Sequence, residues 1–167
     1  MQSATEGWLP IANPPVGLVT WYAPDGTAMA LVTSWLGVIA GQPPELRAGC
    51  CGRPPHAAQF PAGIGFAVNI PARMDLPVLR DLVRPGIAGC AVVVAGAQLA
   101  PARCARAPLL AGCVLQIECA GGRVLPRDWE PELAGEILVV HRGGHTIEPA
   151  ASPDFCTLFP LRADCPG

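Results

Sequence analysis

The chain has 167 residues, of which 51% are hydrophobic and 14% charged, and its formal net charge is −2. This length is typical of one domain with its own core, so we expect residues 1–167 to form a single domain. The slightly acidic charge disfavours binding of nucleic acid, which requires a basic surface. The strongly apolar composition favours a ligand or partner subunit that covers part of the surface.

The sequence predicts no membrane partner, because no run reaches the roughly 18 consecutive apolar residues of a spanning helix. Residues 1–10 lack the basic and apolar regions of a signal peptide, so we expect a cytoplasmic protein. In that compartment the eight cysteines are expected to stay reduced, and most of them to pack as small hydrophobic residues.

The first half of the chain has the composition of short strands separated by Pro and Gly. Pro24-Asp25-Gly26 is expected to form a hairpin turn between the first two strands. A loop and a short strand should occupy 43–51, and a loop or short helix 53–63. The expected longer strands are 16–23, 27–39 and 64–71.

One segment, residues 72–86, has the periodicity of an amphipathic helix that would end at Gly86. Its apolar face would consist of Leu76, Leu79, Leu82 and Val83. Because no other segment shows such a clear helical pattern, the sequence predicts a mostly β fold, a barrel with one main helix.

The second half again predicts strands. Ala120-Gly121-Gly122 is expected to form a hairpin turn between Glu118 and Val124, and residues 145–167 an irregular Pro-rich tail. The expected strands are 90–99, 113–125 and 135–143.

Several stretches resemble the FMN-binding flavin reductase-like proteins. Residues 14–53 contain a Pro-Val start, an Asp-Gly turn, a strand with the sequence Thr33-Ser34-Trp35, a Pro-Pro turn and a basic residue. The sequence FAVNIP follows at 66–71. APLLAGCVLQIEC at 107–119 and GEI at 135–137 resemble two later strands of the family.

The resemblance implies a split β-barrel that binds FMN and forms a homodimer with the flavin near the subunit interface. It also implies an oxidoreductase of the flavin reductase or flavoredoxin type. Electrons would come from NAD(P)H or a redox partner protein and pass through bound FMN. The flavin ring would perform this chemistry, so no catalytic side chain and no metal site are expected.

The same resemblance implies where the flavin binds. The hydroxyl and backbone groups of Thr33 and Ser34 would contact the ribityl chain and phosphate, and Trp35 would pack nearby. Small residues at 49–52 would let the backbone approach the flavin, and Arg53 would pair with the phosphate. The expected cofactor-binding residues are Val32, Thr33, Ser34, Trp35, Gly49, Cys50, Cys51, Gly52, Arg53, His56 and Asn69.

Two departures from the family pattern keep an alternative open. No hydroxyl residue follows Arg53, where the chain reads Pro54-Pro55-His56, and the family's Gly-Asp-His is replaced by Arg127-Asp128-Trp129. The alternative is a non-catalytic binding module on the same barrel, either empty or holding haem or another ligand. A weaker reading is a pyridoxamine-phosphate-oxidase-like enzyme, which usually has more basic residues around its phosphate.

Overall fold

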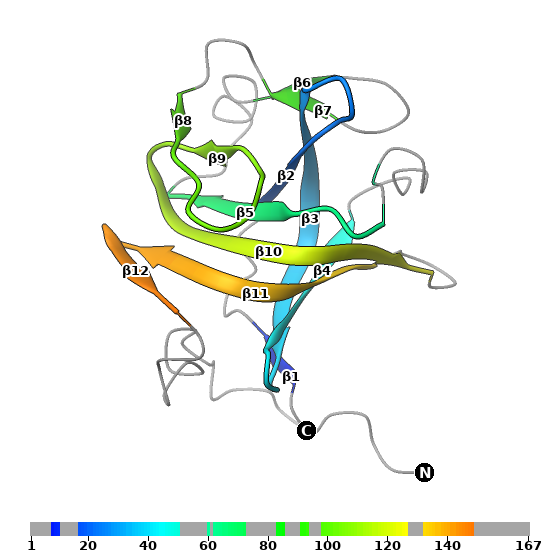
Figure 1. The fold of residues 1–167 in the computed structure, drawn as a ribbon, viewed down its shortest axis with the longest axis vertical. Coiled ribbons are helices and arrows are strands. Elements are labelled where there is room, and N and C mark those ends of the chain that lie inside the picture. The colour runs from blue at the N-terminus through cyan, green and yellow to red at the C-terminus, as the bar shows by residue number, and fades with distance from the viewer. Residues whose placement is uncertain are drawn as a thin grey trace.

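The computed structural model describes residues 8–10, 17–50, 60, 62–72, 83–85, 91–93, 98–126 and 132–148. All regular structure in these ranges is β, arranged as one ten-stranded sheet and one two-stranded sheet (Figure 1). The larger sheet contains β1 (Trp8–Pro10), β2 (Leu18–Tyr22), β3 (Ala28–Ile39), β4 (Glu45–Cys50), β5 (Phe66–Pro71), β6 (Val83–Pro85), β7 (Ala91–Val93), β10 (Cys113–Leu125), β11 (Glu132–Arg142) and β12 (His145–Ile147).

The strands β2, β3, β4, β11, β10 and β5 form a closed antiparallel ring. The strand β4 closes it, because its residues pair with β3 on one edge and with β11 on the other. Gly49, for example, lies opposite Trp35 of β3 on one edge and opposite Glu132 of β11 on the other. Closure removes the free edges that this part of the sheet would otherwise expose. The expected mostly β barrel is confirmed.

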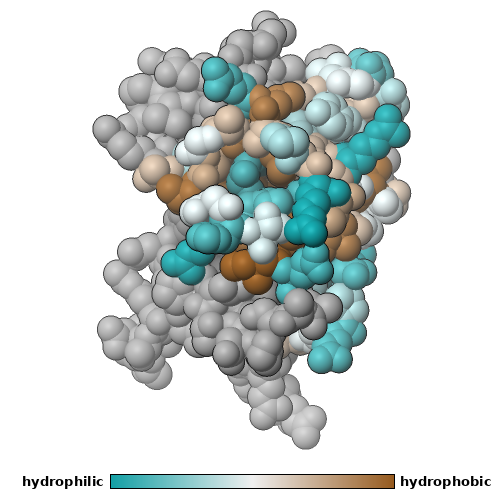
Figure 2. Space-filling view, turned by 60° about the vertical axis from the view of Figure 1, so that its left-hand side comes forward, coloured by the Kyte–Doolittle hydropathy of each residue, from teal (hydrophilic) through white to brown (hydrophobic). Residues whose placement is uncertain are grey.

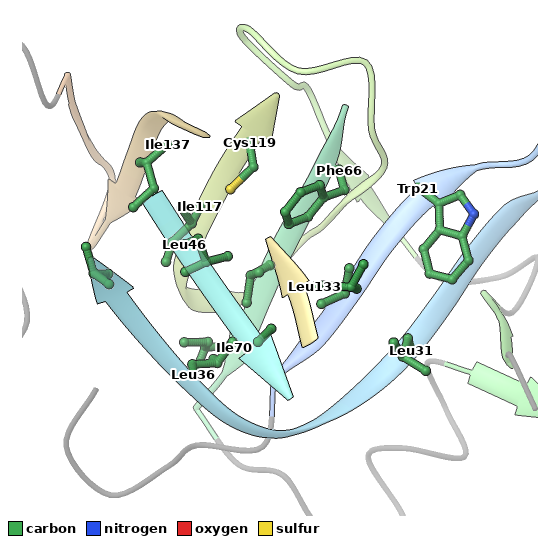
Figure 3. Packing of buried hydrophobic residues seen from close by; sticks show 14 of the residues in the cluster. Trp21, Leu31, Leu36, Leu46, Phe66, Ile70, Ile117, Cys119, Leu133 and Ile137 are labelled. Carbon is green, nitrogen blue, oxygen red and sulfur yellow. The ribbon is translucent and has the colours of Figure 1, made fainter. Parts of the chain in front are cut away.

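The inside of the barrel is filled by large apolar side chains that alternate along the strands, as a half-buried sheet requires. Trp21, Phe60 and Phe66 form an edge-to-face aromatic row, with ring centroids 5.2 and 5.7 Å apart. Figure 3 shows residues of β2, β3, β4, β5, β10 and β11 converging on one core. The barrel is therefore a packed core and not a pore.

A segment that we name the strap, residues 98–111, covers the outer face of β5 and β10. It contains the two-stranded sheet of β8 (Leu99–Ala100) and β9 (Leu109–Leu110). Its small side chains Ala105 and Ala107 pack against Ala67 of β5. Figure 1 shows the loop between β8 and β9 in front of β5. The strap makes this outer face of the barrel a second buried layer.

The predicted helix over 72–86 is wrong at its C-terminal end, where Val83–Pro85 form β6 and pair with β7. Residues 73–82 lie outside the described residues. Strand pairing outweighed the helical spacing of Val83, since short apolar runs fit either structure. Of the strand expected over 90–99, Ala91–Val93 and Leu99–Ala100 are strands, and 94–97 lie outside the described residues.

The predicted hairpin turn at 120–122 is also wrong. The strand β10 continues through Ala120-Gly121-Gly122, and its ladder with β11 shifts register between Ala120 and Arg123. Gly121 has a positive φ of 61°. These glycines make a bulge inside one long strand, which is the other common use of glycine in a sheet.

The predicted irregular tail begins too early, because His145–Ile147 form β12 beside β11. Gly143 and Gly144, with φ of 55° and 81°, supply the left-handed turn between these strands. Within the described parts of the chain, we find no helix long and apolar enough to cross a membrane.

Candidate functional site

The sequence Thr33-Ser34-Trp35 forms a bulge in β3. Thr33 lies opposite Cys50 and Trp35 lies opposite Gly49, so Ser34 is one residue more than β4 provides. A bulge of this kind redirects backbone groups and side chains, and is common beside binding sites. The polar residues that interrupt an apolar strand therefore mark a change in backbone geometry.

Next to the bulge, one edge of β3 changes its partner strand from β7 to β4. The strand β2 and the strand β7 both pair with Met29 and Ala30, so they lie on opposite edges of β3. Thr33 is bonded to Gly17 on the β2 edge and pairs with β4 on the other. On the edge shared by β4 and β7, the described residues provide no strand partner for Leu31 and Val32.

These features bring most of the described candidate residues together. Beside the change of partner strand, β3 contributes Val32, Thr33, Ser34 and Trp35. On the neighbouring strand β4, Cys50 lies opposite Thr33 and Gly49 lies opposite Trp35. Val32 and Trp35 are half-buried, whereas Gly49 is buried. Cys51, Gly52, Arg53 and His56 lie outside the described residues, although the chain leads to them directly from Cys50.

The Thr33 hydroxyl is already bonded within the protein. Thr33 is fully buried. Its Oγ1 accepts a hydrogen bond from the Gly17 backbone N–H at 2.9 Å and donates to the Gly17 carbonyl oxygen at 3.2 Å. A role of this hydroxyl in contacting a ligand therefore stays a prediction, and its partner in the structure is Gly17, directly before β2.

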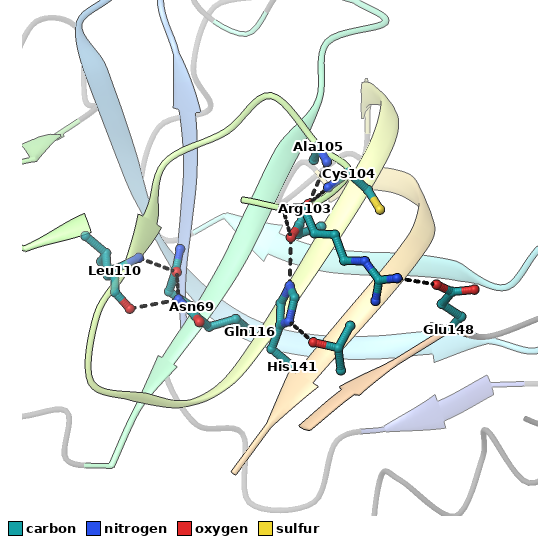
Figure 4. Close-up of polar contacts among 10 residues, drawn as sticks. Asn69, Arg103, Cys104, Ala105, Leu110, Gln116, His141 and Glu148 are labelled. Carbon is teal, nitrogen blue, oxygen red and sulfur yellow. Dashed lines mark hydrogen bonds and ion pairs between the residues drawn. The ribbon is translucent and has the colours of Figure 1, made fainter. Parts of the chain in front are cut away.

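The last described candidate, Asn69, is the centre of a buried polar network on the outer face of the barrel (Figure 4). Its Nδ2 donates to the Leu18 carbonyl oxygen at 3.3 Å and to Thr20 Oγ1 at 2.8 Å. Its Oδ1 accepts from the Leu110 N–H and from Gln116 Nε2, both at 2.9 Å. Asn69 is two strands away from Val32, with Leu18 between them.

All donors and acceptors of the Asn69 amide are thus used within the protein. Gln116 Nε2 also donates to the Leu110 carbonyl oxygen at 2.7 Å, and Thr20 Oγ1 donates to the Pro108 carbonyl oxygen at 2.5 Å. Asn69 fastens the strap to β2, β5 and β10. Any effect of Asn69 on a cofactor would pass through the residues that it holds.

Sequence reasoning missed a second fastening point, the fully buried Glu118. Its carboxylate accepts hydrogen bonds from the backbone N–H groups of Arg103 (2.8 Å), Cys104 (2.6 Å) and Ala105 (2.6 Å). Its Oε1 also lies 2.7 Å from His141 Nε2 (Figure 4). A Gln and a Glu at alternate positions of the otherwise apolar strand VLQIEC were the available signal.

Burial alone would raise the pKa of the Glu118 carboxyl group, but its hydrogen bonds with the strap N–H groups and His141 outweigh that effect and lower it. Because the carboxylate only accepts, His141 Nε2 carries the hydrogen in this contact. His141 Nδ1 lies 3.0 Å from Thr146 Oγ1 on β12. Glu118 thus connects the strap, β10 and the β11–β12 hairpin.

Two of the sequence motifs meet in space. Gly135, in the GEI sequence of β11, lies against the ring of Phe66 from FAVNIP. A Cβ added to Gly135 would stand 2.4 Å from Phe66 Cε1. The glycine is therefore required by the close approach of the aromatic ring. Among the described residues, no cluster of three or more His, Cys, Asp or Glu side chains could hold a metal ion.

Several solved structures that this chain resembles are named as flavin reductases, flavoredoxins or an NADH:FAD oxidoreductase. The NADH:FAD oxidoreductase SgcE6 of Streptomyces globisporus C-1027 superposes with a TM-score of 0.59 over 85% of this chain and 81% of that chain, at 21% identity. The chain has the fold of the flavin reductases and flavoredoxins. The Streptomyces protein has also been solved with NAD and FAD fragments.

Two further similar structures represent other members of this fold. Flavoredoxin of Desulfovibrio vulgaris (Miyazaki F) has a TM-score of 0.56 and 18% identity over 85% of this chain and 76% of that chain. The styrene monooxygenase flavin reductase of Pseudomonas putida S12 has a TM-score of 0.55 and 10% identity over 80% of this chain and 89% of that chain. No protein-family model and no curated protein matches the sequence. The flavin reductase-like split-barrel fold expected from the sequence is confirmed.

Proposed function

We propose that this protein binds FMN and acts as an oxidoreductase of the flavin reductase or flavoredoxin type. The observation that carries the proposal is the bulge at Ser34, which lies beside the gap between the pairing of β3 with β7 and with β4, and where six of the eleven candidate cofactor residues meet. A bound flavin supplies hydride and electron transfer at its ring. The names of the structural neighbours, which include an NADH:FAD oxidoreductase and flavoredoxins, support this class of chemistry.

In this proposal the protein binds and orients the cofactor. The backbone at the bulge and at Gly49 would approach the ribityl chain and phosphate, because a bulge leaves ladder positions without their usual partner. Arg53, which follows β4 in the chain, would pair with the phosphate through its guanidinium group. Trp35, half-buried on β3, would pack beside the ring.

We also propose a homodimer, as the resemblance to the flavin reductase-like proteins implies. On the side where the strap and β12 lie, hydrophobic and hydrophilic side chains are interspersed (Figure 2). Among the described residues, Leu99 of β8 and Val114 of β10 are large hydrophobic side chains that are 48% and 49% exposed. Exposed apolar side chains favour contact with a second copy of the chain. Sedimentation of the purified protein would test this, and a monomer at all concentrations would contradict it.

The visible absorption spectrum of the purified protein tests the proposed cofactor. FMN, FAD or riboflavin is added in separate samples and free flavin is removed. We expect retention of FMN above that of riboflavin, because riboflavin lacks the phosphate. If the protein retains only FAD, then FAD and not FMN is the cofactor. A protein that retains no flavin would favour the non-catalytic binding module.

The electron donor is tested in the same samples by anaerobic addition of NADH or NADPH. Bleaching of the flavin would identify a reductase, because the nicotinamide then reduces the bound ring. Retained flavin that is bleached by dithionite but by neither nicotinamide would identify a flavoredoxin-like carrier supplied by a redox partner protein.

Substitution of Arg53 by Ala tests the phosphate contact. Arg53→Ala should weaken FMN binding by about tenfold or more and leave riboflavin binding nearly unchanged, because only FMN offers a phosphate. The matched control is Arg106→Ala, since Arg106 is exposed on the strap. Equal FMN retention in both variants would remove Arg53 from the site. Ser34→Leu, which adds bulk at the bulge, should abolish FMN retention.

A further inference from the structure

We infer that Thr33 is a positioning residue of the flavin site, an inference that rests on the proposed function. Its buried hydroxyl, bonded to Gly17 directly before β2, fixes the bulge at Ser34 in the geometry that receives the cofactor. The hydroxyl itself does not touch the flavin. This role differs from the direct contact that the resemblance implies.

The contacts between Thr33 and Gly17 form a compact clamp. The Thr33 N–H donates to the Gly17 carbonyl oxygen at 2.9 Å, and the Thr33 hydroxyl donates to the same oxygen at 3.2 Å. In return the Gly17 N–H donates to Thr33 Oγ1 at 2.9 Å. The only hydroxyl hydrogen is thereby used, and Thr33 is 0% exposed. A bound cofactor could not reach this group without displacing β2.

The clamp acts at the residue that decides the register of β3. Thr33 is the last residue before the extra residue Ser34, and on its other edge it lies opposite Cys50. A shift of register by one residue turns every side chain of a strand to the opposite face. Because Thr33 is hydrogen-bonded to Gly17 on one edge of β3 and lies opposite Cys50 on the other, the bulge is confined to Ser34 and the backbone beside Gly49 keeps one arrangement.

Gly17 completes the clamp, because an added Cβ would be tightly enclosed there. A Cβ at this position would stand 3.1 Å from Leu36 Cδ1, 3.3 Å from Val68 Cγ1 and 3.4 Å from Thr33 Oγ1. Two of these neighbours are core side chains and the third is the clamp hydroxyl. Alanine at position 17 would therefore require these neighbours to shift by a few tenths of an ångström, and we expect this crowding to loosen the clamp.

The experiment compares Thr33→Val, which keeps the shape but removes the hydroxyl, with Thr33→Ser, which keeps the hydroxyl. Two quantities are measured: the Kd for FMN from quenching of flavin fluorescence, and amide hydrogen exchange at residues 33–35 in the flavin-free protein. We expect Thr33→Val to weaken FMN and riboflavin binding alike, by about tenfold, and to speed exchange at Ser34. Thr33→Ser should restore both values.

Each other outcome overturns the inference in a recognisable way. If Thr33→Val weakens FMN binding but leaves the flavin-free exchange unchanged, the hydroxyl contacts the cofactor directly. If both quantities stay at the wild-type values, the clamp does not position the bulge. If the wild-type protein retains no flavin, the proposed function itself fails, and the exchange measurement still reports whether the clamp holds Ser34.

Gly17→Ala provides a second route to the same clamp if Thr33→Val does not fold. It should reproduce the faster exchange and the weaker flavin binding, and its effects should not add to those of Thr33→Val, since both substitutions break one set of contacts. Additive effects would show that the two residues act separately. Far-UV circular dichroism and the Tm of each variant control for loss of fold.

Discussion

In this barrel, the most constrained single residues are glycines that pack directly against an aromatic ring. Gly135 of β11 packs against the ring of Phe66, and Gly122 of β10 packs against the ring of Phe60. A Cβ added to Gly122 would lie 2.8 Å from Phe60 Cε1. The aromatic row of Trp21, Phe60 and Phe66 therefore continues into the strand backbones. Replacement of either glycine by a larger residue would therefore disturb the packing of the aromatic row in the centre of the core.

Replacement of Gly135 by Ala should destabilise the protein by about 1–3 kcal/mol, because the added methyl group must displace the Phe66 ring. The free energy of unfolding in urea measures this effect. Gly26→Ala is a control for overpacking, because its Cβ would meet no atom within 4 Å, although its positive φ of 84° adds a separate strain. A Gly135→Ala variant as stable as the wild type would contradict the close contact.

The described cysteines should differ sharply in reactivity. Burial raises the pKa of the Cys113 thiol to about 11. Burial, and secondly the charge of Glu118, raise the pKa of Cys119 well above its usual value. Cys104 is exposed. Since the thiolate is the reactive form, iodoacetamide at pH 8 should label Cys104 readily, Cys113 slowly and Cys119 only after unfolding.

Peptide mapping by mass spectrometry would measure the three rates. Labelling of Cys119 in the folded protein at the rate of Cys104 would contradict its place in the core. The expectation that cysteines pack as small hydrophobic residues is confirmed at Cys119, which is 0% exposed. Sequence alone could not separate Cys119 from Cys104, because burial depends on how β10 and the strap meet.

At the scale of elements, the strap depends on the barrel for its position. The buried side chains of Glu118 and Asn69 bind its backbone at 103–105 and at Leu110. An additional exposed ion pair joins Arg103 to Glu148 at 3.0 Å. Exposed pairs contribute little to stability, so the buried carboxylate and amide are the main fastenings.

Glu118→Gln should destabilise the protein at pH 7 by about 1–3 kcal/mol for each strap N–H left without an acceptor. The pKa of Glu118 is lowered in the folded state from its ordinary value of 4.5. The carboxylate therefore stabilises the fold above about pH 4.5, and this contribution is lost as the pH falls through the lower folded pKa. The stability difference between variant and wild type should shrink in that range.

Urea unfolding of both proteins between pH 7 and pH 3 would measure that convergence. The control is Glu136→Gln, because Glu136 is exposed on β11. A constant difference at all pH values would contradict the role of the ionised carboxylate. Hydrogen exchange at residues 103–105 should also increase in Glu118→Gln and remain unchanged in Glu136→Gln.

The elements illustrate what sequence patterns can predict. Strands with regular alternation and clear turns, such as those around Pro24-Asp25-Gly26, were predicted closely. The glycines at 120–122 were misread as a turn, because a local pattern does not distinguish a bulge from a hairpin. The fastening of the strap was not predicted, since Glu118 and the backbone of Cys104 are brought together only by tertiary packing.

At the scale of the whole molecule, the barrel is closed by one short strand. The strand β4 carries Leu46 and Ala48 into the core and pairs with both β3 and β11. Charged side chains support this closure from outside: Arg47 lies 3.2 Å from Glu132, and Glu45 pairs with Arg47 and Arg123. Burial alone would raise the pKa of the Glu45 carboxyl group, but the hydrogen bonds and charges of Arg123 and Arg47 outweigh this effect, so its pKa is lowered.

Leu46→Ala should therefore weaken the whole barrel. We expect a loss of about 2–5 kcal/mol, typical of a cavity in a packed core, with a single cooperative transition. Circular dichroism and tryptophan fluorescence during urea unfolding would test this. Separate transitions by the two probes would show that β4 detaches before the rest of the barrel. Gln98→Ala, at an exposed position of the strap, is the control.

The order of motifs along the chain predicted the barrel, because strands that resemble a known fold carry their pairing with them. The cofactor-binding role of the candidate residues stays a prediction. Closure by β4 on two edges was not predicted, since no local pattern indicates a second partner. The position of Thr33 was predicted but its bonding to Gly17 was not. A hydroxyl in a strand looks the same in the sequence whether it faces a ligand or another strand.

The strap also has a consequence for engineering and for divergence among related chains. Every hydrogen bond that fastens it to Glu118, Asn69, Gln116 or Thr20 uses a backbone atom of the strap. These contacts do not depend on the side chains at 103 or 104. Exposed positions of this segment can therefore be randomised in a library, or exchanged for a recognition peptide of equal length, while the barrel keeps its anchoring residues.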